Sequence, residues 1–133
     1  MFDINPDIHQ AQTLSSEFYT DEKYFEQSKE KIFARTWHFV GTTEEENNLK
    51  PFSILDTPLL LSRAGESIAC YSNVCTHRGA ILVEKDCQAS GIRCRYHGRR
   101  FDLQGKFLSM PEFENVRNFP TEKDDLPRIS SAL

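Results

Sequence analysis

The feature that most constrains this chain is a repeated pairing of one cysteine with one histidine. The first pair lies in Cys75-Thr76-His77, and the second lies in Cys94-Arg95-Tyr96-His97. A glycine follows each histidine, Gly79 after one residue and Gly98 directly. Thiolates and imidazoles are ligands of transition metals and of iron–sulfur clusters. We therefore expect two separate loops to bring these side chains to one metal centre.

Two cysteines and two histidines are the ligand set of a Rieske [2Fe–2S] centre, in which two thiolates hold one iron and two imidazoles hold the other. The candidate cofactor ligands are Cys75, His77, Cys94 and His97. Glycines beside such ligands let the backbone approach a cluster and donate N–H groups to its sulfides. A chain with this centre carries one electron at a time and has no catalytic residue of its own.

Three other interpretations of these residues differ in what they explain. A structural zinc site accepts two cysteines and two histidines, but its usual fingers group cysteine with cysteine and histidine with histidine along the chain. A disulfide between Cys75 and Cys94 leaves both histidines unexplained. A nucleophilic cysteine with a histidine base needs one residue of each type and does not predict the duplication.

Composition and charge exclude several other classes of protein. The chain has 133 residues and a net charge of −4, which fits one acidic globular domain and disfavours a nucleic-acid or anionic-membrane surface. No apolar run approaches the ~20 residues that cross a bilayer. The N-terminal residues lack the basic and apolar regions of a signal peptide. We therefore expect a cytoplasmic protein whose cysteines are thiols or metal ligands.

The pattern before residue 50 predicts a polar leader over residues 1–17 and a helix over residues 20–36. Thr20 is the expected N-cap, and basic residues lie toward the C-terminal end, as the helix dipole prefers. Four apolar side chains share one face that is expected to pack on the rest of the domain: Phe25, Ile32, Phe33 and Trp37. Residues 42–48 are expected to form a solvated loop.

From Pro51 onward, short runs with β-like patterns alternate with turn residues. The expected strands are residues 52–56, 59–63, 67–72, 80–83, 92–94, 100–103 and 106–109, the last two forming a hairpin. This pattern predicts a mostly β fold, a small antiparallel sandwich or barrel with one N-terminal helix. Residues 118–133 are polar and contain two prolines, so they are expected to form a tail or a linker.

At this point the chain resembles a known family, the Rieske non-haem iron oxygenases that include the aromatic ring-hydroxylating dioxygenases. The similarity is to the N-terminal Rieske domain of their α (oxygenase) subunit and covers about residues 18–111. It is carried by three segments: Tyr24-Phe25 through Gly41, Pro58–Arg63 with Asn73–Ala80, and Cys94–Gly98 with Phe101–Lys106. Two positions depart from the family, because Thr76 stands where arginine is commoner and Arg99 stands where tryptophan usually follows His-Gly.

The resemblance implies a Rieske domain over residues 18–117, with Cys75 and Cys94 on one iron and His77 and His97 on the other. Such a domain takes electrons from a ferredoxin or a flavin reductase. It passes them to a mononuclear iron in a catalytic domain, which activates O2. The sequence contains no Asp/Glu-x-x-His-x-x-x-x-His segment for that second iron. We therefore expect residues 118–133 to lead toward a catalytic domain that is absent from this sequence.

Two further functional interpretations stay open at this stage. A free-standing Rieske ferredoxin has a similar length, although the leader helix favours the oxygenase. A zinc-stabilised, non-redox interaction domain is the third. Arginines near the ligands also suggest a basic rim that steers an acidic redox partner, or that forms salt bridges to a catalytic domain. These residues are Arg78, Arg95, Arg99 and Arg100.

Overall fold

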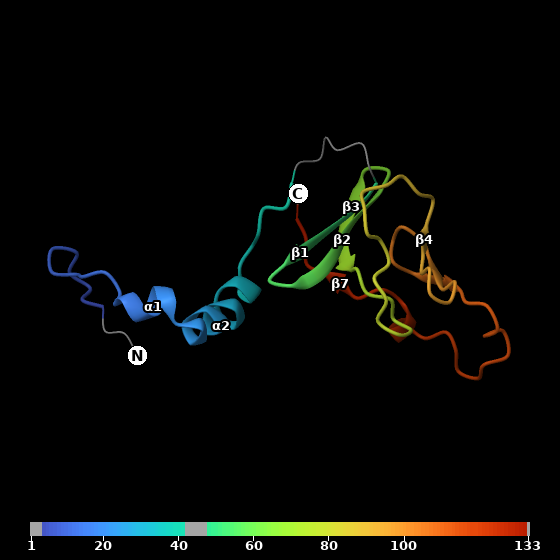
Figure 1. The fold of residues 1–133 in the computed structure, drawn as a ribbon. Coiled ribbons are helices and arrows are strands. Elements are labelled where there is room, and N and C mark those ends of the chain that lie inside the picture. Colours follow the sequence, from blue (N-terminus) through green and yellow to red (C-terminus); the bar gives the residue numbers. More distant parts are fainter. Residues whose placement is uncertain (1–3, 42–47, 133) are drawn as a thin grey trace. The chain divides into compact units, whose positions relative to one another are not determined.

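The computed structural model describes residues 4–41 and 48–132 and divides the chain into two units, Met1–Gly41 and Thr42–Leu133 (Figure 1). Most of the expected loop at residues 42–48 lies outside the described residues. No helix in the described part of the chain has both the length and the apolar character needed to span a bilayer.

The described residues of the N-terminal unit form three short helices: α1 (Ser16–Thr20), α2 (Glu22–Lys31) and the 3-10 helix η1 (Phe33–Arg35). The predicted N-terminal helix is present as α2, but its N-cap is Asp21 and not Thr20, and it ends at Lys31 and not at residue 36. Asp21 adopts an extended backbone conformation that separates α1 from α2, and its carboxylate accepts a hydrogen bond from the Lys23 N–H at 2.9 Å. Aspartate is a better N-cap than threonine, and Thr20 instead donates its hydroxyl to the Ser16 carbonyl.

The apolar face predicted for this region is not buried within its own unit. No residue of α1, α2 or η1 is buried, and the Trp37 side chain is 75% exposed. The expectation that this face packs on the rest of the domain therefore stays a prediction.

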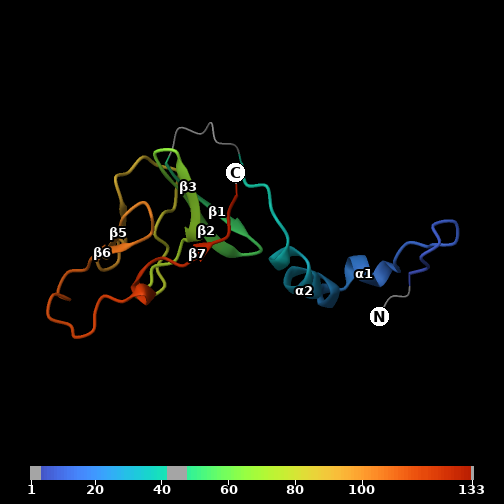
Figure 2. The ribbon, with the colours of Figure 1, turned by 180° about the vertical axis from the view of Figure 1, so that it is seen from behind.

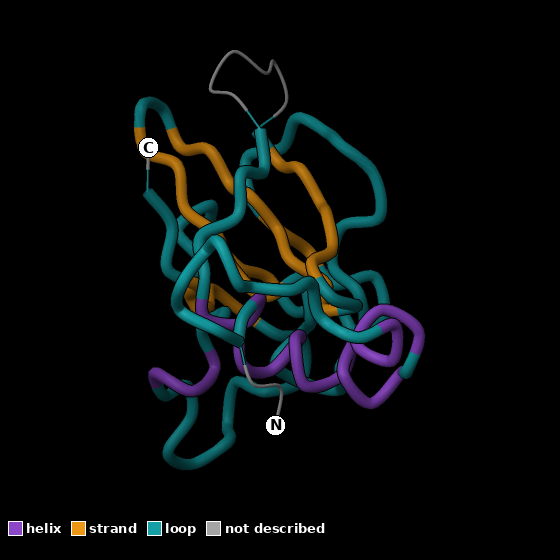
Figure 3. Tube along the Cα trace, turned by 90° about the vertical axis from the view of Figure 1, so that its left-hand side faces the viewer, coloured by secondary structure: helices purple, strands orange, loops and turns teal. Residues whose placement is uncertain are grey.

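The second unit consists of two antiparallel sheets, as predicted for a mostly β fold. The first sheet has the order β1 (Leu49–Ile54), β2 (Thr57–Ala64), β3 (Ser67–Ser72) and β7 (Arg128–Ile129). The second has the order β4 (Ile92–Arg93), β5 (Arg100–Phe101) and β6 (Phe107–Ser109). Both sheets are visible in Figures 1 and 2, and long loops connect the strands in Figure 3.

Tight turns join β1 to β2 and β2 to β3 in the first sheet. Leu55 and Asp56 connect β1 to β2 and both have positive φ, 51° and 66°. Positive φ at both central residues of a two-residue turn matches the right-handed twist of the flanking strands. Gly65, with φ of 63°, lies in the next turn, where the sequence predicts one. These turns fix the register that carries β3 into the first Cys/His segment.

The core lies between the two sheets and includes two of the candidate ligands. Its buried members are Leu49, Leu60, Ala69, Tyr71, Cys75, Leu82, Val83, Ile92, Cys94, Phe101 and Leu126. A Cβ at Gly105 would lie 2.7 Å from the Tyr71 ring, so only glycine fits this turn between β5 and β6. The sulfur atoms of the two candidate ligands are therefore placed by the packed core.

Two sequence expectations in this unit need correction. Residues 80–83 do not form a strand, because Ile81 makes only an isolated bridge with Val74. Residues 118–133 are not a free tail. They contain the 3-10 helix η2 (Glu122–Asp124), the buried Leu126, and β7, which pairs with β3 through Cys70 and Tyr71. Their polar composition is misleading because the side chains of Asp124 and Asp125 form ion pairs within the fold.

Candidate metal centre

The four candidate ligands lie on two loops. Cys75 and His77 lie on the loop between β3 and β4, and Cys94 and His97 lie on the loop between β4 and β5. Both thiols are buried, whereas both imidazoles are half-buried. The sulfurs therefore lie toward the core, and the imidazoles lie nearer the surface of this unit.

The two loops share one backbone conformation. The N–H of each cysteine donates to the carbonyl five residues later, Cys75 to Ala80 at 2.8 Å and Cys94 to Arg99 at 2.8 Å. The backbone thus forms the same turn twice, although the histidine follows its cysteine after two residues in one loop and after three in the other.

Side chains of the same kind face one another across the loops. The Cys94 thiol acts on the Cys75 thiol and raises its pKa, which makes the two thiols neighbours, and all four cysteines of the chain are free, so no disulfide joins them. The rings of His77 and His97 have their centroids 4.8 Å apart at an interplanar angle of 74°. The sequence alternates cysteine with histidine, but the fold sorts them into a thiol pair and an imidazole pair.

One imidazole nitrogen is buried without a partner. The Nδ1 atom of His97 has no hydrogen-bond partner among the described residues, although buried polar atoms are nearly always paired. A ring nitrogen left free in this way is suited to bind a metal. Within the described residues, no three His, Cys, Asp or Glu side chains converge on a single metal ion. The fit to a two-iron cluster rests on the two pairs, since each iron takes two protein ligands.

Burial and nearby charges shift the pKa values of these groups. Burial raises the pKa of the Cys75 thiol, although a hydrogen bond from the backbone N–H of His77 opposes this shift. Burial also lowers the pKa of His77, and the charges of His97, Arg78 and Arg99 lower it further. A neutral imidazole is the form that binds a metal, whereas the thiols must lose their protons as the metal binds.

A buried amide closes the base of the first loop. The Asn73 side chain donates to the Val83 carbonyl at 2.7 Å and accepts from the Val83 N–H at 3.0 Å. The carbonyl of Asn73 also accepts from the Leu82 N–H at 3.1 Å. These contacts hold the ends of residues 73–83 together, so Cys75 and His77 project from a closed loop.

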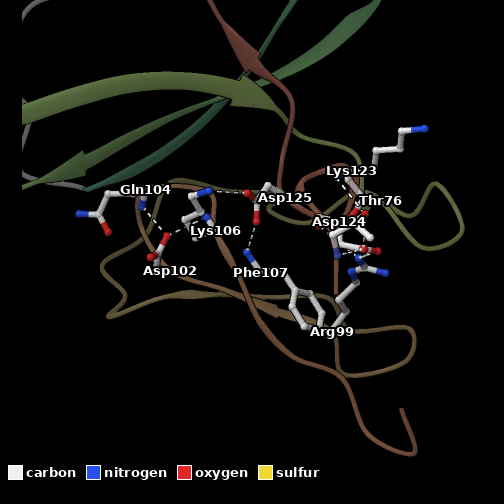
Figure 4. Close-up of polar contacts among 10 residues, drawn as sticks. Thr76, Arg99, Asp102, Gln104, Lys106, Phe107, Lys123, Asp124 and Asp125 are labelled. Carbon is white, nitrogen blue, oxygen red and sulfur yellow. Dashed lines mark hydrogen bonds and ion pairs between the residues drawn. The ribbon is translucent and has the colours of Figure 1, made fainter. Parts of the chain in front are cut away.

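Arg99, in the second loop, forms an ion pair with Asp124 of η2 (Figure 4). The Arg99 Nη2 atom lies 2.6 Å from Asp124 Oδ1, and the arginine residue is only 2% exposed. The Thr76 hydroxyl donates to the Asp124 carbonyl at 2.8 Å. Arg99 therefore does not belong to an exposed basic rim, and that part of the rim hypothesis is wrong. Arg78, Arg95 and Arg100 are exposed.

Aromatic rings border the two imidazoles. The Tyr96 ring lies 3.8 Å from the His97 ring between centroids, and the Phe113 ring lies 5.9 Å from the His77 ring. Tyr96 is exposed, so it covers one face of His97 without removing the imidazole from the surface. The site is thus apolar on its inner side and partly open at the histidines.

Comparison with known proteins now decides the family. A family model described as the Rieske [2Fe-2S] domain matches residues 36–120, which include both loops and all four candidate ligands. The chain belongs to the Rieske [2Fe–2S] domain family. The cofactor of this Rieske domain is accordingly a Rieske-type [2Fe–2S] cluster, and the paired thiols, the paired imidazoles and the unpartnered Nδ1 fit it.

Relatives of this Rieske domain are oxygenase subunits. It is 34% identical over 130 residues to the carnitine monooxygenase oxygenase subunit of Escherichia coli (strain K12), covering 94% of this chain and 34% of that protein. It is 32% identical over 109 residues to the benzene 1,2-dioxygenase subunit alpha of Pseudomonas putida, covering 77% and 24%. The chain spans about a third of the length of the carnitine monooxygenase subunits it matches.

Solved structures agree with the fold. A quaternary ammonium Rieske monooxygenase in complex with L-carnitine matches with a TM-score of 0.83 at 28% identity, over 90% of this chain and 36% of that one. A naphthalene 1,2-dioxygenase with indole bound matches with a TM-score of 0.75 at 27% identity, over 86% and 27%. The mostly β Rieske fold expected from the sequence is thereby confirmed.

Sequence reasoning missed two parts of the site. The Asn73 side-chain clamp has no local sequence signal, because its partner is ten residues away in an irregular loop. The sequence does contain a signal for the structural role of Asp124. Thr121-Glu122-Lys123-Asp124 has the Thr-x-x-Asp spacing of a capping box, and the structure forms that box at η2. From its polar composition, this segment is expected to form part of a tail or a linker.

Proposed function

We propose that this Rieske domain relays single electrons within a Rieske-type oxygenase, with Cys75 and Cys94 holding one iron and His77 and His97 holding the other. The observation that carries the proposal is the sorting of the ligands into a thiol pair and an imidazole pair. When bound, the cluster supplies a one-electron couple whose potential depends on its ligands, its hydrogen bonds and its exposure to solvent.

The protein would bury the cluster on the side of the two cysteines and leave it accessible to a redox partner on the side of the two histidines. The core around Cys75 and Cys94 excludes water from the thiolates, which protects them from oxidation and exchange. The half-buried histidines offer a short path between the cluster and a docked partner. The closed first loop fixes His77 relative to His97, so little rearrangement accompanies the gain or loss of an electron.

The partners we propose are a catalytic domain with a mononuclear iron, as the electron acceptor, and a ferredoxin or flavin reductase, as the donor. The names of the relatives support this proposal, because they are oxygenase subunits that act on carnitine, benzene or choline. The substrate class belongs to the catalytic domain. The exposed Arg78, Arg95 and Arg100 provide positive charge for an acidic donor. We propose a cytoplasmic location for this exchange.

The test is a reversible redox titration of the cluster-loaded chain. Dithionite is added under argon, and oxidised cytochrome c is then added as a one-electron acceptor. The proposal predicts that each cluster takes up one electron and then returns it. The visible absorption spectrum monitors both steps. Cys94→Ser should abolish the chromophore, whereas Cys87→Ser, which removes a free thiol outside the site, should preserve it. A chain that binds no iron, or that loses its chromophore equally in both variants, contradicts the proposal.

A further inference from the structure

Arg99 is a buried cation placed directly beside the cluster ligands. It follows His97 by two residues, and its charge acts on both Cys75 and His77. Charged side chains are almost never fully buried without a partner, because leaving water is costly for an ion. The structure provides one partner, since Nη2 donates to Asp124 Oδ1 at 2.6 Å and to the Asp124 carbonyl at 3.2 Å.

Three aromatic rings also lie near the guanidinium. Its carbon Cζ lies 4.8 Å from the Phe107 ring centroid, 5.7 Å from that of Phe119 and 5.8 Å from that of Phe101. The Nε–H is buried and has no hydrogen-bond partner among the described residues. Aromatic faces attract a cation, but they screen its field far less than water does. The positive charge is therefore felt strongly by neighbouring groups.

Asp124 is held in place independently of Arg99. Its Oδ2 atom accepts from the Thr121 N–H at 2.7 Å and from the Thr121 hydroxyl at 3.0 Å, and its carbonyl accepts from Thr76 Oγ1. Thr76 lies between the two ligands of the first loop, and Arg99 lies in the second. Asp124, which lies in η2, thus contacts both loops. Its carboxylate is held in a fixed position beside the Arg99 guanidinium (Figure 4).

We propose that Arg99 and Asp124 set the reduction potential of the cluster as an opposed pair of buried charges, with Arg99 favouring the reduced form and Asp124 moderating that effect. The inference rests on the proposed function. Reduction transfers one electron from the donor to the cluster and adds one negative charge to it. The nearby cation stabilises that charge, and the carboxylate opposes it. Both are positioning residues that act through the field at the ligands.

The experiment measures the midpoint potential by spectroelectrochemical titration of the holoprotein at fixed pH and salt. Arg99→Met removes the cation while keeping an unbranched apolar side chain, and it should lower the potential. The expected size is roughly tenfold in the equilibrium constant for reduction, or ~59 mV for a one-electron couple. Asp124→Asn removes only the negative charge and should raise the potential. The double variant Arg99→Met/Asp124→Asn should fall between the two.

A matched control removes the same charge at an exposed position. Arg93 immediately precedes Cys94 and is exposed, so Arg93→Met should shift the potential much less than Arg99→Met. Shifts of the same sign in Arg99→Met and Asp124→Asn, or an Arg93→Met shift as large as that of Arg99→Met, would overturn the inference. If Arg99→Met fails to fold, Asp124→Asn decides alone, because an unchanged or lowered potential contradicts the opposed pair.

The outcome also separates this inference from the proposed function. Wild-type protein that binds no redox-active cluster refutes the proposed function and, with it, the inference. Wild-type protein with a reversible cluster, together with variants that keep the cluster but show no shift, refutes only the role of Arg99 and Asp124. The iron content of each variant is measured together with its reduction potential. This shows whether a variant has lost the cluster or has kept it without a shift in potential.

Discussion

Gly79 and Gly98 are equivalent residues of the two ligand loops. Each has a positive φ, 71° and 75°, and each donates its N–H to the carbonyl of the cysteine four residues earlier, at 3.0 Å and 3.1 Å. Because this conformation is costly for residues with a Cβ, the repeated Cys/Gly spacing reflects a backbone requirement as well as the ligand chemistry.

Alanine at these two glycines should destabilise the fold to different degrees. Both substitutions force a Cβ into positive φ, at a cost of about 1–2 kcal/mol. A Cβ at Gly79 meets no atom within 4 Å, whereas one at Gly98 lies 3.2 Å from Pro111 Cγ. We therefore expect Gly98→Ala to lower the thermal unfolding midpoint more than Gly79→Ala. The reverse order would contradict the contact between a Cβ at Gly98 and Pro111 as the cause of the difference.

The C-terminal segment should contribute to stability as part of the core. Leu126 is 4% exposed and belongs to the core cluster, so Leu126→Ala should cost about 2–5 kcal/mol in the free energy of unfolding. Ile129, on the same segment but 37% exposed, is the matched control, and Ile129→Ala should cost much less. Equal, small effects in denaturant titrations would mean that residues 121–129 are a detachable tail.

Two asparagines make the same pair of hydrogen bonds in different surroundings. Asn73 bonds the N–H and carbonyl of Val83, and Asn48 bonds those of Ala89. Asn73 is buried and Asn48 is half-buried, so water can replace the lost bonds only at Asn48. Asn73→Ala should cost about 1–3 kcal/mol more than Asn48→Ala in chemical unfolding, because it leaves buried groups unpaired. A larger loss in Asn48→Ala would contradict the clamp.

Acid should weaken the fold partly through Asp125. The hydrogen bond from Lys106, with a second from the Phe107 N–H, holds the pKa of this carboxyl below its ordinary value of 3.8. A lowered folded pKa gives stability that is fully present above the unfolded pKa and is lost as the pH falls through the folded one. Asp125→Asn should therefore destabilise the protein at neutral pH.

The difference between wild type and Asp125→Asn should begin to shrink below pH ~4, where Asp125 of the unfolded chain binds a proton, and should disappear once the pH falls below the lowered pKa of the folded carboxyl. Glu66→Gln, in the exposed turn after β2, is the control that removes a carboxylate without these two partners, and it should have little effect at either pH. A constant difference between wild type and Asp125→Asn across acid unfolding curves would rule out this contribution.

Local patterns predicted much of the framework. The strand at residues 67–72 was correctly bounded because turn residues flank a short β-like run, and the hairpin around Gln104-Gly105 was found for the same reason. The helix start was wrong because Thr20 and Asp21 are adjacent capping residues and the backbone selects the second. Two neighbouring N-cap candidates cannot be ranked by position alone.

Sequence patterns did not predict the contacts between residues that are far apart in the chain. The candidate ligands were recognised from their types and spacing, but the sorting of thiol with thiol and imidazole with imidazole depends on how two loops face one another. Arg99 was expected at the surface because arginine is rarely buried, and its partner Asp124 lies 25 residues away in a polar segment. Only the folded arrangement of η2 against both loops accounts for its burial.

The most direct test of the account is the iron and acid-labile sulfide content of the purified chain, with an EPR spectrum after dithionite reduction. The account predicts about two irons and about two sulfides per chain, as for one [2Fe–2S] cluster, and a rhombic signal with a low average g value. Stoichiometric zinc after anaerobic purification, with no reducible chromophore even after attempted cluster reconstitution, would contradict it and leave a structural metal domain.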